Sequence, residues 1–288
     1  MEREGDGAMG AGAEARRAYE QRVASRGLPC EMPPASDTPG REDYGWIPFE
    51  GLLNTRDLGG LVGLDGRCIK RGLLLRSGSL GEGTEADFTR LRDEYRLRLV
   101  VDLRGNQELA EVPDPMDRLP DARYVHAGII DERIIGISQD ELSREEERLR
   151  ASESDDVPST MMAVLYPHML LDDAGVNGYR TFFHELLACE EGAALWHCSV
   201  GRDRCGLASA LVESVLGVSE ADMEADYLAT NVYASYEATL FGAACLISFR
   251  AAHDAAEREY GGFTGYVTDA LGVTPGEVDE LRARYLEP

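Results

Sequence analysis

The stretch from Ala194 to Gly206 constrains the fold of this 288-residue chain more than any other segment. An apolar run leads into His197 and Cys198, five residues separate Cys198 from Arg204, and an apolar segment, 207–212, follows. This pattern predicts a strand, a tight loop and a helix. In such an arrangement the N–H groups of the loop and of the first helical turn converge on one point, where the helix dipole adds partial positive charge. The segment therefore predicts an anion-binding loop at the end of a strand.

Cys198 and Arg204 carry the side chains in this loop that suit chemistry on a phosphate. A thiol in positive surroundings ionises readily, and the thiolate is a nucleophile. Arginine offers a planar fork of donors that can bind two phosphate oxygens. The Cys-x5-Arg spacing alone is weak evidence, but the preceding strand, His197, Gly201 and the helix that Gly206 opens make it specific. We therefore expect attack by Cys198 on phosphorus.

We assign further roles to the residues around this pair. Ser199, Val200, Gly201 and Arg202 are expected to cradle the phosphate, with Gly201 letting the backbone turn inward. His197 is expected to orient the loop rather than to touch substrate. A carboxylic acid must protonate the leaving oxygen; Asp203 is the first candidate, and Asp102 and Asp57 are the alternatives.

A metal site is not expected, and neither is a cofactor. Six residues separate Cys198 from Cys205, and no Cys-x2-Cys or His-x3-His pair accompanies them. The six cysteines are scattered, which suggests reduced thiols.

The formal charge of −24 argues against a nucleic-acid partner. No apolar run is long enough for a membrane span, and the first 26 residues carry no signal-peptide pattern, so we expect a cytoplasmic protein, with export by another route left open.

The distribution of apolar residues predicts an α/β sandwich with a mainly parallel central sheet, flanked by helices, and a helical C-terminal part. Strands are expected near 73–77, 97–104, 123–128 and 193–196. Helices are expected near 13–25, 84–95, 138–150, 157–171, 177–189, 219–229, 231–260, 263–271 and 274–285, with Thr84 and Asp87 capping the second of these. We divide the chain into a flexible N-terminal arm, 1–43, and one domain, 44–288. Within it, 131–173 is a helical insertion that is either a lid over the site or a hairpin packed away from it.

The loop also resembles a known one. The run from His197 to Arg204 is similar to the His-Cys-x-x-Gly-Lys-Asp-Arg loop of the bacterial tyrosine-phosphatase family, whose activities overlap with those of dual-specificity and lipid phosphatases. Three more segments agree: Asn54-Thr55-Arg56-Asp57-Leu58-Gly59-Gly60, Val101-Asp102-Leu103-Arg104 and Asp226-Tyr227-Leu228-Ala229-Thr230-Asn231. The resemblance implies the cysteine-phosphatase sandwich with a helical lid. It also implies metal-independent hydrolysis of phosphotyrosine, with phosphoserine, phosphothreonine or phosphoinositides as further substrates, and Asp203 as the acid.

The chain departs from the family pattern at two positions. Arg202 stands where the family has lysine, and Cys205 where it has a threonine or serine hydroxyl. That hydroxyl helps the sulfur to leave when the intermediate is hydrolysed, and a thiol is a weaker donor. We therefore expect slow turnover, and two alternatives stay open: a phospho-binding protein with little activity, or a thiol-dependent arsenate reductase that uses Cys205 as its resolving thiol. The sequence gives no signal for the oligomeric state.

Overall fold

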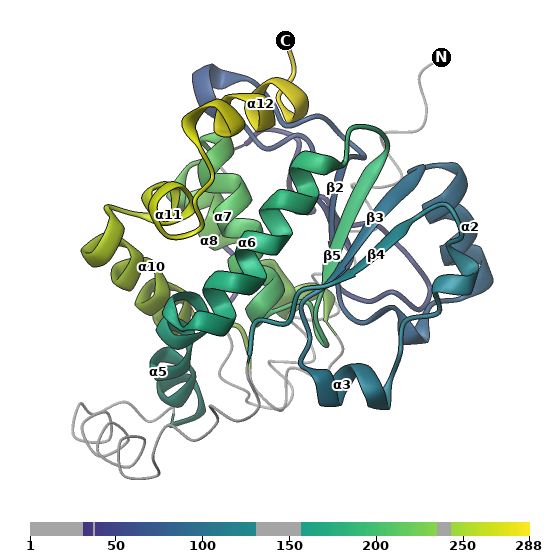
Figure 1. Ribbon diagram of the computed structural model, residues 1–288, viewed down its shortest axis with the longest axis horizontal. Helices are drawn as coiled ribbons and strands as arrows, with labels where there is room; N and C mark the ends of the chain where they lie inside the picture. The colour runs from purple at the N-terminus through teal and green to yellow at the C-terminus, as the bar shows by residue number, and fades with distance from the viewer. Residues whose placement is uncertain (1–30, 37, 131–156, 235–242) are drawn as a thin grey trace.

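A mostly parallel sheet lies at the centre of the molecule, with helices on both faces (Figure 1). The computed structural model describes residues 31–36, 38–130, 157–234 and 243–288. In this part of the chain the strand order is β1-β2-β5-β3-β4, and only β1 runs antiparallel to its neighbour. The strands are β1 (Arg56–Asp57), β2 (Leu74–Ser77), β3 (Leu97–Asp102), β4 (Arg123–His126) and β5 (Ala193–His197). The mixed α/β fold with a mainly parallel sheet is confirmed.

The central strand β5 is buried on both faces, which explains its continuous apolar sequence. Because successive side chains of a strand point to opposite faces, Ala193 and Leu195 pack into one core and Ala194 and Trp196 into another. The first core lies under α2 (Glu85–Asp93), and the second, larger core lies under α6 (Asp173–Ala188) and α7 (Asp203–Leu216).

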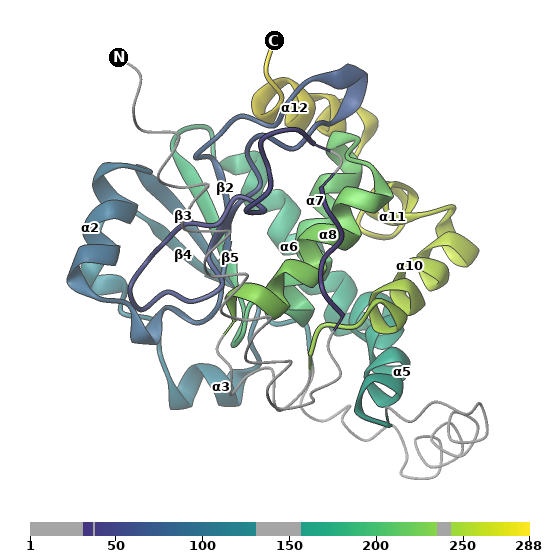
Figure 2. The same ribbon diagram turned by 180° about the vertical axis from the view of Figure 1, so that it is seen from behind.

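The remaining helices surround this frame. Figures 1 and 2 show α8 and α10 to α12 on the same side of the sheet as α6 and α7, where they complete the larger core, and α3 next to the end of the sheet. Their bounds are α3 (Asn106–Glu111), α5 (Val157–Leu171), α8 (Glu220–Tyr233), α10 (Leu246–Tyr260), α11 (Phe263–Gly265) with a π turn at Tyr266–Ala270, and α12 (Pro275–Tyr285). None of the helices in the described part of the chain has the length and apolar character that a bilayer crossing requires.

Local capping signals predicted the start of α2 correctly. The Thr84 hydroxyl accepts a hydrogen bond from the Asp87 amide at 3.2 Å, and the Asp87 carboxylate accepts one from the Thr84 amide at 3.0 Å. This reciprocal pair satisfies two N–H groups that the first helical turn leaves without partners. Asp87 also accepts hydrogen bonds from the amides of Glu50 and Gly51, so the same carboxylate ties the helix to the preceding loop.

The expected continuous helix from Asn231 to Tyr260 is wrong. The backbone leaves the helical region at Ala234, where α8 ends, and is extended again at Cys245, where α10 begins. The Asn231 side chain accepts a hydrogen bond from the Ala244 amide and donates one to the Ala244 carbonyl, at 2.7 and 2.8 Å. The Asn231 side chain, by bonding both backbone groups of Ala244, ties the end of α8 to the extended residues before α10.

Part of the expected N-terminal arm and insertion can be placed. Residues from 31 onward run along α8 (Figure 2), where the hydroxyls of Ser36 and Thr38 donate to the Asp222 carboxylate at 2.7 and 2.9 Å. Of the insertion, the structure describes α5, which packs against α10. The helices expected at 13–25 and 138–150 lie outside the described residues.

Candidate active site

The candidate site lies where three parallel strands end together. In the sheet register, His197 at the end of β5 pairs with Ser77 of β2 and with Asp102 of β3. The loop that follows β5 contains Cys198 to Arg202, and α7 begins at Asp203. Ligand sites of open α/β sheets occur at such carboxyl ends. The strand, loop and helix around Cys198 are therefore arranged as the sequence predicts.

Hydrogen bonds from outside the loop fix its backbone. The Asn54 side chain donates to the carbonyls of Val200 and Gly201 at 2.9 and 3.1 Å. Arg76 donates to the Gly201 carbonyl at 2.7 Å, and the Ser79 amide donates to the Ser199 carbonyl at 3.0 Å. These bonds turn the carbonyls of Ser199, Val200 and Gly201 toward the surrounding segments, an arrangement that favours a nest of N–H groups on the opposite side of the loop.

Gly201 meets both a conformational and a steric requirement of this loop. Its φ is +72°, in the left-handed region that glycine adopts at no steric cost. A Cβ atom at this position would lie 2.5 Å from the Ser77 carbonyl oxygen, closer than any real contact. The loop can therefore pass the end of β2 only with glycine here.

Arg76 is itself held by an ion pair with Asp226. The Asp226 carboxylate of α8 bonds Arg76 and also accepts from Arg56 Nε at 3.2 Å. All three side chains are buried, and the two arginines outweigh the effect of burial and lower the pKa of Asp226. Arg56 thus belongs to a buried salt-bridge cluster, which connects α8 to the loop through Arg76.

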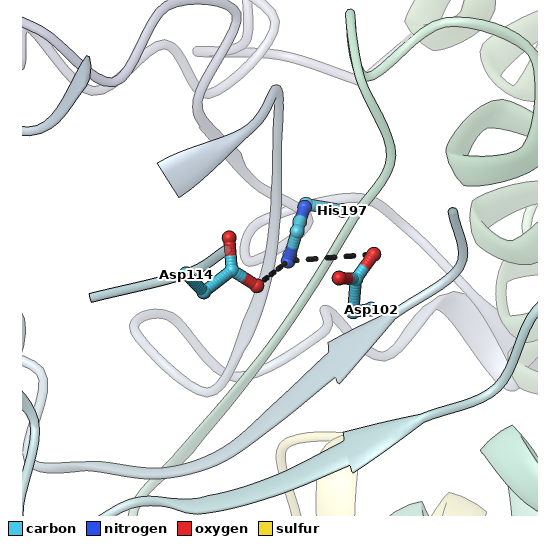
Figure 3. A group of neighbouring side chains, drawn as sticks. All are labelled: Asp102, Asp114 and His197. Carbon is cyan, nitrogen blue, oxygen red and sulfur yellow. Dashed lines mark hydrogen bonds and ion pairs between the residues drawn. The ribbon is translucent and has the colours of Figure 1, made fainter. Parts of the chain in front are cut away.

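His197 lies between the loop and a carboxylate that the sequence analysis did not single out. Its Nδ1 is 3.2 Å from the Cys198 carbonyl oxygen, and its Nε2 is 2.8 Å from Asp114 Oδ2 (Figure 3). Asp102 Oδ1 is further away, at 3.9 Å from Nε2. The ring therefore bridges the backbone of Cys198 and the segment after α3.

Asp102, Asp114 and His197 form the one group of potential metal ligands found among the described residues (Figure 3). Arg104 already pairs with both carboxylates, because its Nη2 lies 2.7 Å from Asp102 and 3.0 Å from Asp114. Burial raises the pKa of Asp102, but bonds from Arg104 and the charge of His197 outweigh it and bring that pKa to about 2. The cluster is thus an ion-pair network in which one guanidinium serves both carboxylates.

Glu108 of α3 is the main partner of Arg204. The two carboxylate oxygens bond the two terminal nitrogens of Arg204, with an Nη2–Oε1 distance of 2.9 Å, and Ser199 donates to the same carboxylate. Burial raises the pKa of Glu108, but Arg204 outweighs it and brings the pKa to about 2. The fork expected to bind phosphate thus already faces an internal anion.

Asp203 lies at the first position of α7, directly after the loop residue Arg202. Arg202 Nε donates to Asp203 Oδ1 at 2.9 Å, and the Tyr166 hydroxyl of α5 donates to the same oxygen at 2.6 Å. Burial raises the pKa of Asp203, but Arg202 and Tyr166 outweigh it, and the net effect lowers that pKa.

The other two acid candidates are occupied elsewhere. Both oxygens of Asp57 accept hydrogen bonds at 2.8 Å from the amides of Gly59 and Gly72, where they hold the turn after β1. Asp102 is bonded by Arg104 and by the Tyr124 hydroxyl, which donates at 3.0 Å. Of the three aspartates, Asp203 alone belongs to the loop and its helix.

Cys205 is buried in α7 and its thiol donates to a backbone carbonyl. The Sγ atom lies 3.6 Å from the Trp196 carbonyl oxygen. Burial raises the pKa of the Cys205 thiol to about 12, and the nearby Cys198 adds to the increase. The proton of this thiol is thus bonded to β5 rather than to the Cys198 sulfur.

Comparison with known proteins agrees with this geometry. The profile of the tyrosine phosphatase family matches residues 47–287. The chain belongs to the tyrosine phosphatase family. It is 31% identical to a provisionally named tyrosine-protein phosphatase of Cupriavidus necator, over 89% of this chain and 93% of the relative. It is 25% identical to a tyrosine-protein phosphatase of Nostoc commune, over 73% of each chain.

The structure of this phosphatase adds three site residues that sequence reasoning missed: Glu108, Asp114 and Tyr166. Each is brought to the loop from a distant segment, and the Glu108 and Arg204 positions are 96 residues apart. The only local signal was the position of Glu108, three residues after Gly105 at the start of a helix that follows β3. That position predicts a helix cap, not a contact with Arg204.

Proposed function

We propose that this phosphatase hydrolyses phosphotyrosine through a cysteinyl-phosphate intermediate and requires no metal. The observation that carries the proposal is the fixed loop between β5 and α7, with Cys198 at its start and Arg204 in the first turn of the helix. The external bonds on the loop carbonyls support a nest of N–H groups around a phosphate. Arg204 would add a planar fork to this nest.

In the first step, the Cys198 thiolate forms an S–P bond as the P–O bond to the phenol breaks. Asp203 gives its proton to the departing oxygen and becomes a carboxylate. In the second step, water attacks phosphorus, Asp203 takes up the proton, and the thiolate is released. Phosphoserine, phosphothreonine and phosphoinositides are further candidate substrates, on the resemblance to the bacterial family alone.

The test is hydrolysis of an aryl phosphate, a phosphotyrosine peptide, a phosphoserine peptide and a phosphoinositide, each in the presence of EDTA. We expect turnover that survives EDTA, is abolished in Cys198→Ser and is reduced on the phosphotyrosine peptide in Asp203→Ala. Full activity in Cys198→Ser, or loss of activity with EDTA that added metal restores, would refute the mechanism.

The main alternative is a phosphate-binding protein with little turnover. Cys205 favours it, because the Cys205 thiol donates to Trp196 instead of to the nucleophile. It predicts that vanadate binds while none of the four substrates is hydrolysed. Arsenate reduction is the second alternative and predicts consumption of arsenate that depends on added thiol.

A further inference from the structure

Two buried tyrosines of the larger core form a hydrogen-bonded chain that ends at Asp203. Tyr166 of α5 and Tyr227 of α8 are 1% and 2% exposed. Their hydroxyl oxygens are 2.6 Å apart, and Tyr166 is also 2.6 Å from Asp203 Oδ1. A hydroxyl without a partner is costly in such a core, and phenylalanine would fill the same space without that cost. The Tyr166 hydroxyl has such a partner in the carboxyl group of Asp203, and the Tyr227 hydroxyl has one in Tyr166.

The direction of the hydrogen bonds follows from the number of protons. An ionised carboxylate only accepts, so the single hydroxyl proton of Tyr166 is donated to Asp203. The contact between the two tyrosines then requires Tyr227 to donate to Tyr166. The order is Tyr227 to Tyr166 to Asp203, and each bond in such a chain strengthens the next.

Packing fixes both rings in place. Their planes are nearly perpendicular, at 87°, with centroids 6.1 Å apart. Tyr227 also stacks on Phe249 of α10, with a centroid distance of 4.9 Å. The pair therefore presents one donor in a fixed direction from a rigid part of the core.

Both donors to Asp203 bond the same carboxylate oxygen. Arg202 Nε and the Tyr166 hydroxyl both bond Oδ1, at 2.9 and 2.6 Å. A proton on Oδ1 would face these two donors, so the transferable proton belongs on Oδ2. We propose that Tyr166, supported by Tyr227, is a positioning residue. Its hydrogen bond to Oδ1 keeps the proton of Asp203 on Oδ2, from which it is donated to the leaving group. This inference rests on the proposed role of Asp203 as the acid.

The charged and titratable groups around Asp203 come from several elements. They are Arg202, Arg204 and Cys198 of the loop region, Tyr166 of α5, Tyr227 of α8, Glu108 of α3 behind Arg204, and Cys245 before α10 behind Tyr227. Burial raises the pKa of Asp203; Arg202, Tyr166 and Arg204 lower it, in that order. Removing the Tyr166 hydroxyl therefore raises this pKa.

The first measurement is the pH dependence of kcat/KM for phenyl phosphate. An acid must be protonated, so the rate falls as pH rises through the pKa of Asp203. In Tyr166→Phe we expect this falling limb to move to higher pH by about one unit. Tyr227→Phe should move it in the same direction by less, because Tyr166 keeps its own proton but loses its donor.

The second measurement compares leaving groups at the lowest pH of the profile, where the protonated fraction of Asp203 is greatest in every variant. Phenyl phosphate needs a proton on its leaving oxygen far more than 4-nitrophenyl phosphate does. If Oδ2 is no longer directed at that oxygen, Tyr166→Phe should lose about tenfold in kcat/KM on phenyl phosphate and about twofold or less on the nitro compound. General damage to the fold would reduce both equally.

Tyr266→Phe is the matched control. Tyr266 is buried in the same core and its hydroxyl donates to the Leu170 carbonyl at the end of α5, without contact to Asp203. In Tyr266→Phe we expect no shift in the falling limb of the pH profile of kcat/KM, and equal effects on kcat/KM for both substrates.

The inference is overturned if Tyr166→Phe and Tyr227→Phe both behave like Tyr266→Phe. If circular dichroism shows that Tyr166→Phe does not fold, the test is the shift of the falling limb in Tyr227→Phe, and the absence of that shift overturns the inference. Cys198→Ser separates this result from the proposed function: activity that disappears in Cys198→Ser, beside unchanged tyrosine variants, refutes the tyrosine role alone.

Discussion

The guanidinium of Arg204, which we expect to bind phosphate, is held in place by the carboxylate of Glu108. Glu108 bonds both of its terminal nitrogens, and the low pKa of Glu108, about 2, keeps this carboxylate ionised throughout the neutral range. A phosphate entering the loop meets a guanidinium whose charge is already partly offset. Glu108 is 37% exposed at its side chain, so solvent screens the pair and its effect is moderate.

Replacing Glu108 by glutamine should strengthen oxyanion binding. The charge is removed while one carbonyl oxygen still accepts from Arg204, so vanadate should bind about three- to tenfold more tightly. Calorimetric titration measures this affinity directly. Glu111→Gln, on the exposed side of the same helix, is the control and should change it little. Weaker binding in Glu108→Gln would mean that Glu108 holds Arg204 in place more than it opposes the substrate.

Threonine at position 205 should speed hydrolysis of the phosphoenzyme. A hydroxyl is a better donor than a thiol whose pKa is about 12, so a threonine that reaches the Cys198 sulfur stabilises it as it leaves. One such bond corresponds to about tenfold in rate. Rapid-quench kinetics should show a smaller burst and a faster steady state in Cys205→Thr. Unchanged turnover would show that the thiol at 205 imposes no penalty.

At the scale of elements, the sequence was informative wherever the signals were local. The strand, loop and helix around Cys198, and the start of α2, follow from apolar periodicity and capping residues within one turn. The break between α8 and α10 did not, because the segment around Asn231 has an amphipathic pattern and the decisive bonds run from its side chain to Ala244. The hydrogen-bond partners of Arg204 and Asp203 could not be predicted from the sequence either, since only tertiary packing brings α3 and α5 to the loop.

The capping box of α2 gives a prediction for stability. Thr84→Ala removes the acceptor for the Asp87 amide and should lower the free energy of unfolding by about 1 kcal/mol. Urea unfolding should show a lower midpoint with an unchanged slope. Thr89→Ala in the same helix serves as a comparison. A loss below about 0.3 kcal/mol in Thr84→Ala would mean that the bonds from Asp87 to the preceding loop suffice to hold the helix start.

At the scale of the whole molecule, the charge of −24 opposes the approach of any anionic substrate. The attraction of the loop acts over a short distance, whereas the repulsion of the surface extends over about 10 Å at moderate salt and further in dilute buffer. The two effects therefore respond differently to ionic strength.

Added salt should raise kcat/KM for an acidic phosphotyrosine peptide by about two- to fivefold between dilute and physiological ionic strength. The reason is that screening weakens the long-range repulsion more than the contacts inside the loop. A phosphotyrosine peptide with several lysines should show the opposite trend. A fall in kcat/KM with salt for the acidic peptide would show that a local positive field governs the encounter.

The central claim is that Cys198 carries the phosphoryl group during turnover. The most direct test is a rapid quench of the enzyme during hydrolysis of a phosphotyrosine peptide, followed by peptide mapping with mass spectrometry. We predict one phosphoryl group on the peptide that contains Cys198, and none in Cys198→Ser. The weak donor at position 205 should slow hydrolysis of the intermediate and so help it to accumulate. An enzyme that turns over at full rate while Cys198 never carries phosphate would contradict the account.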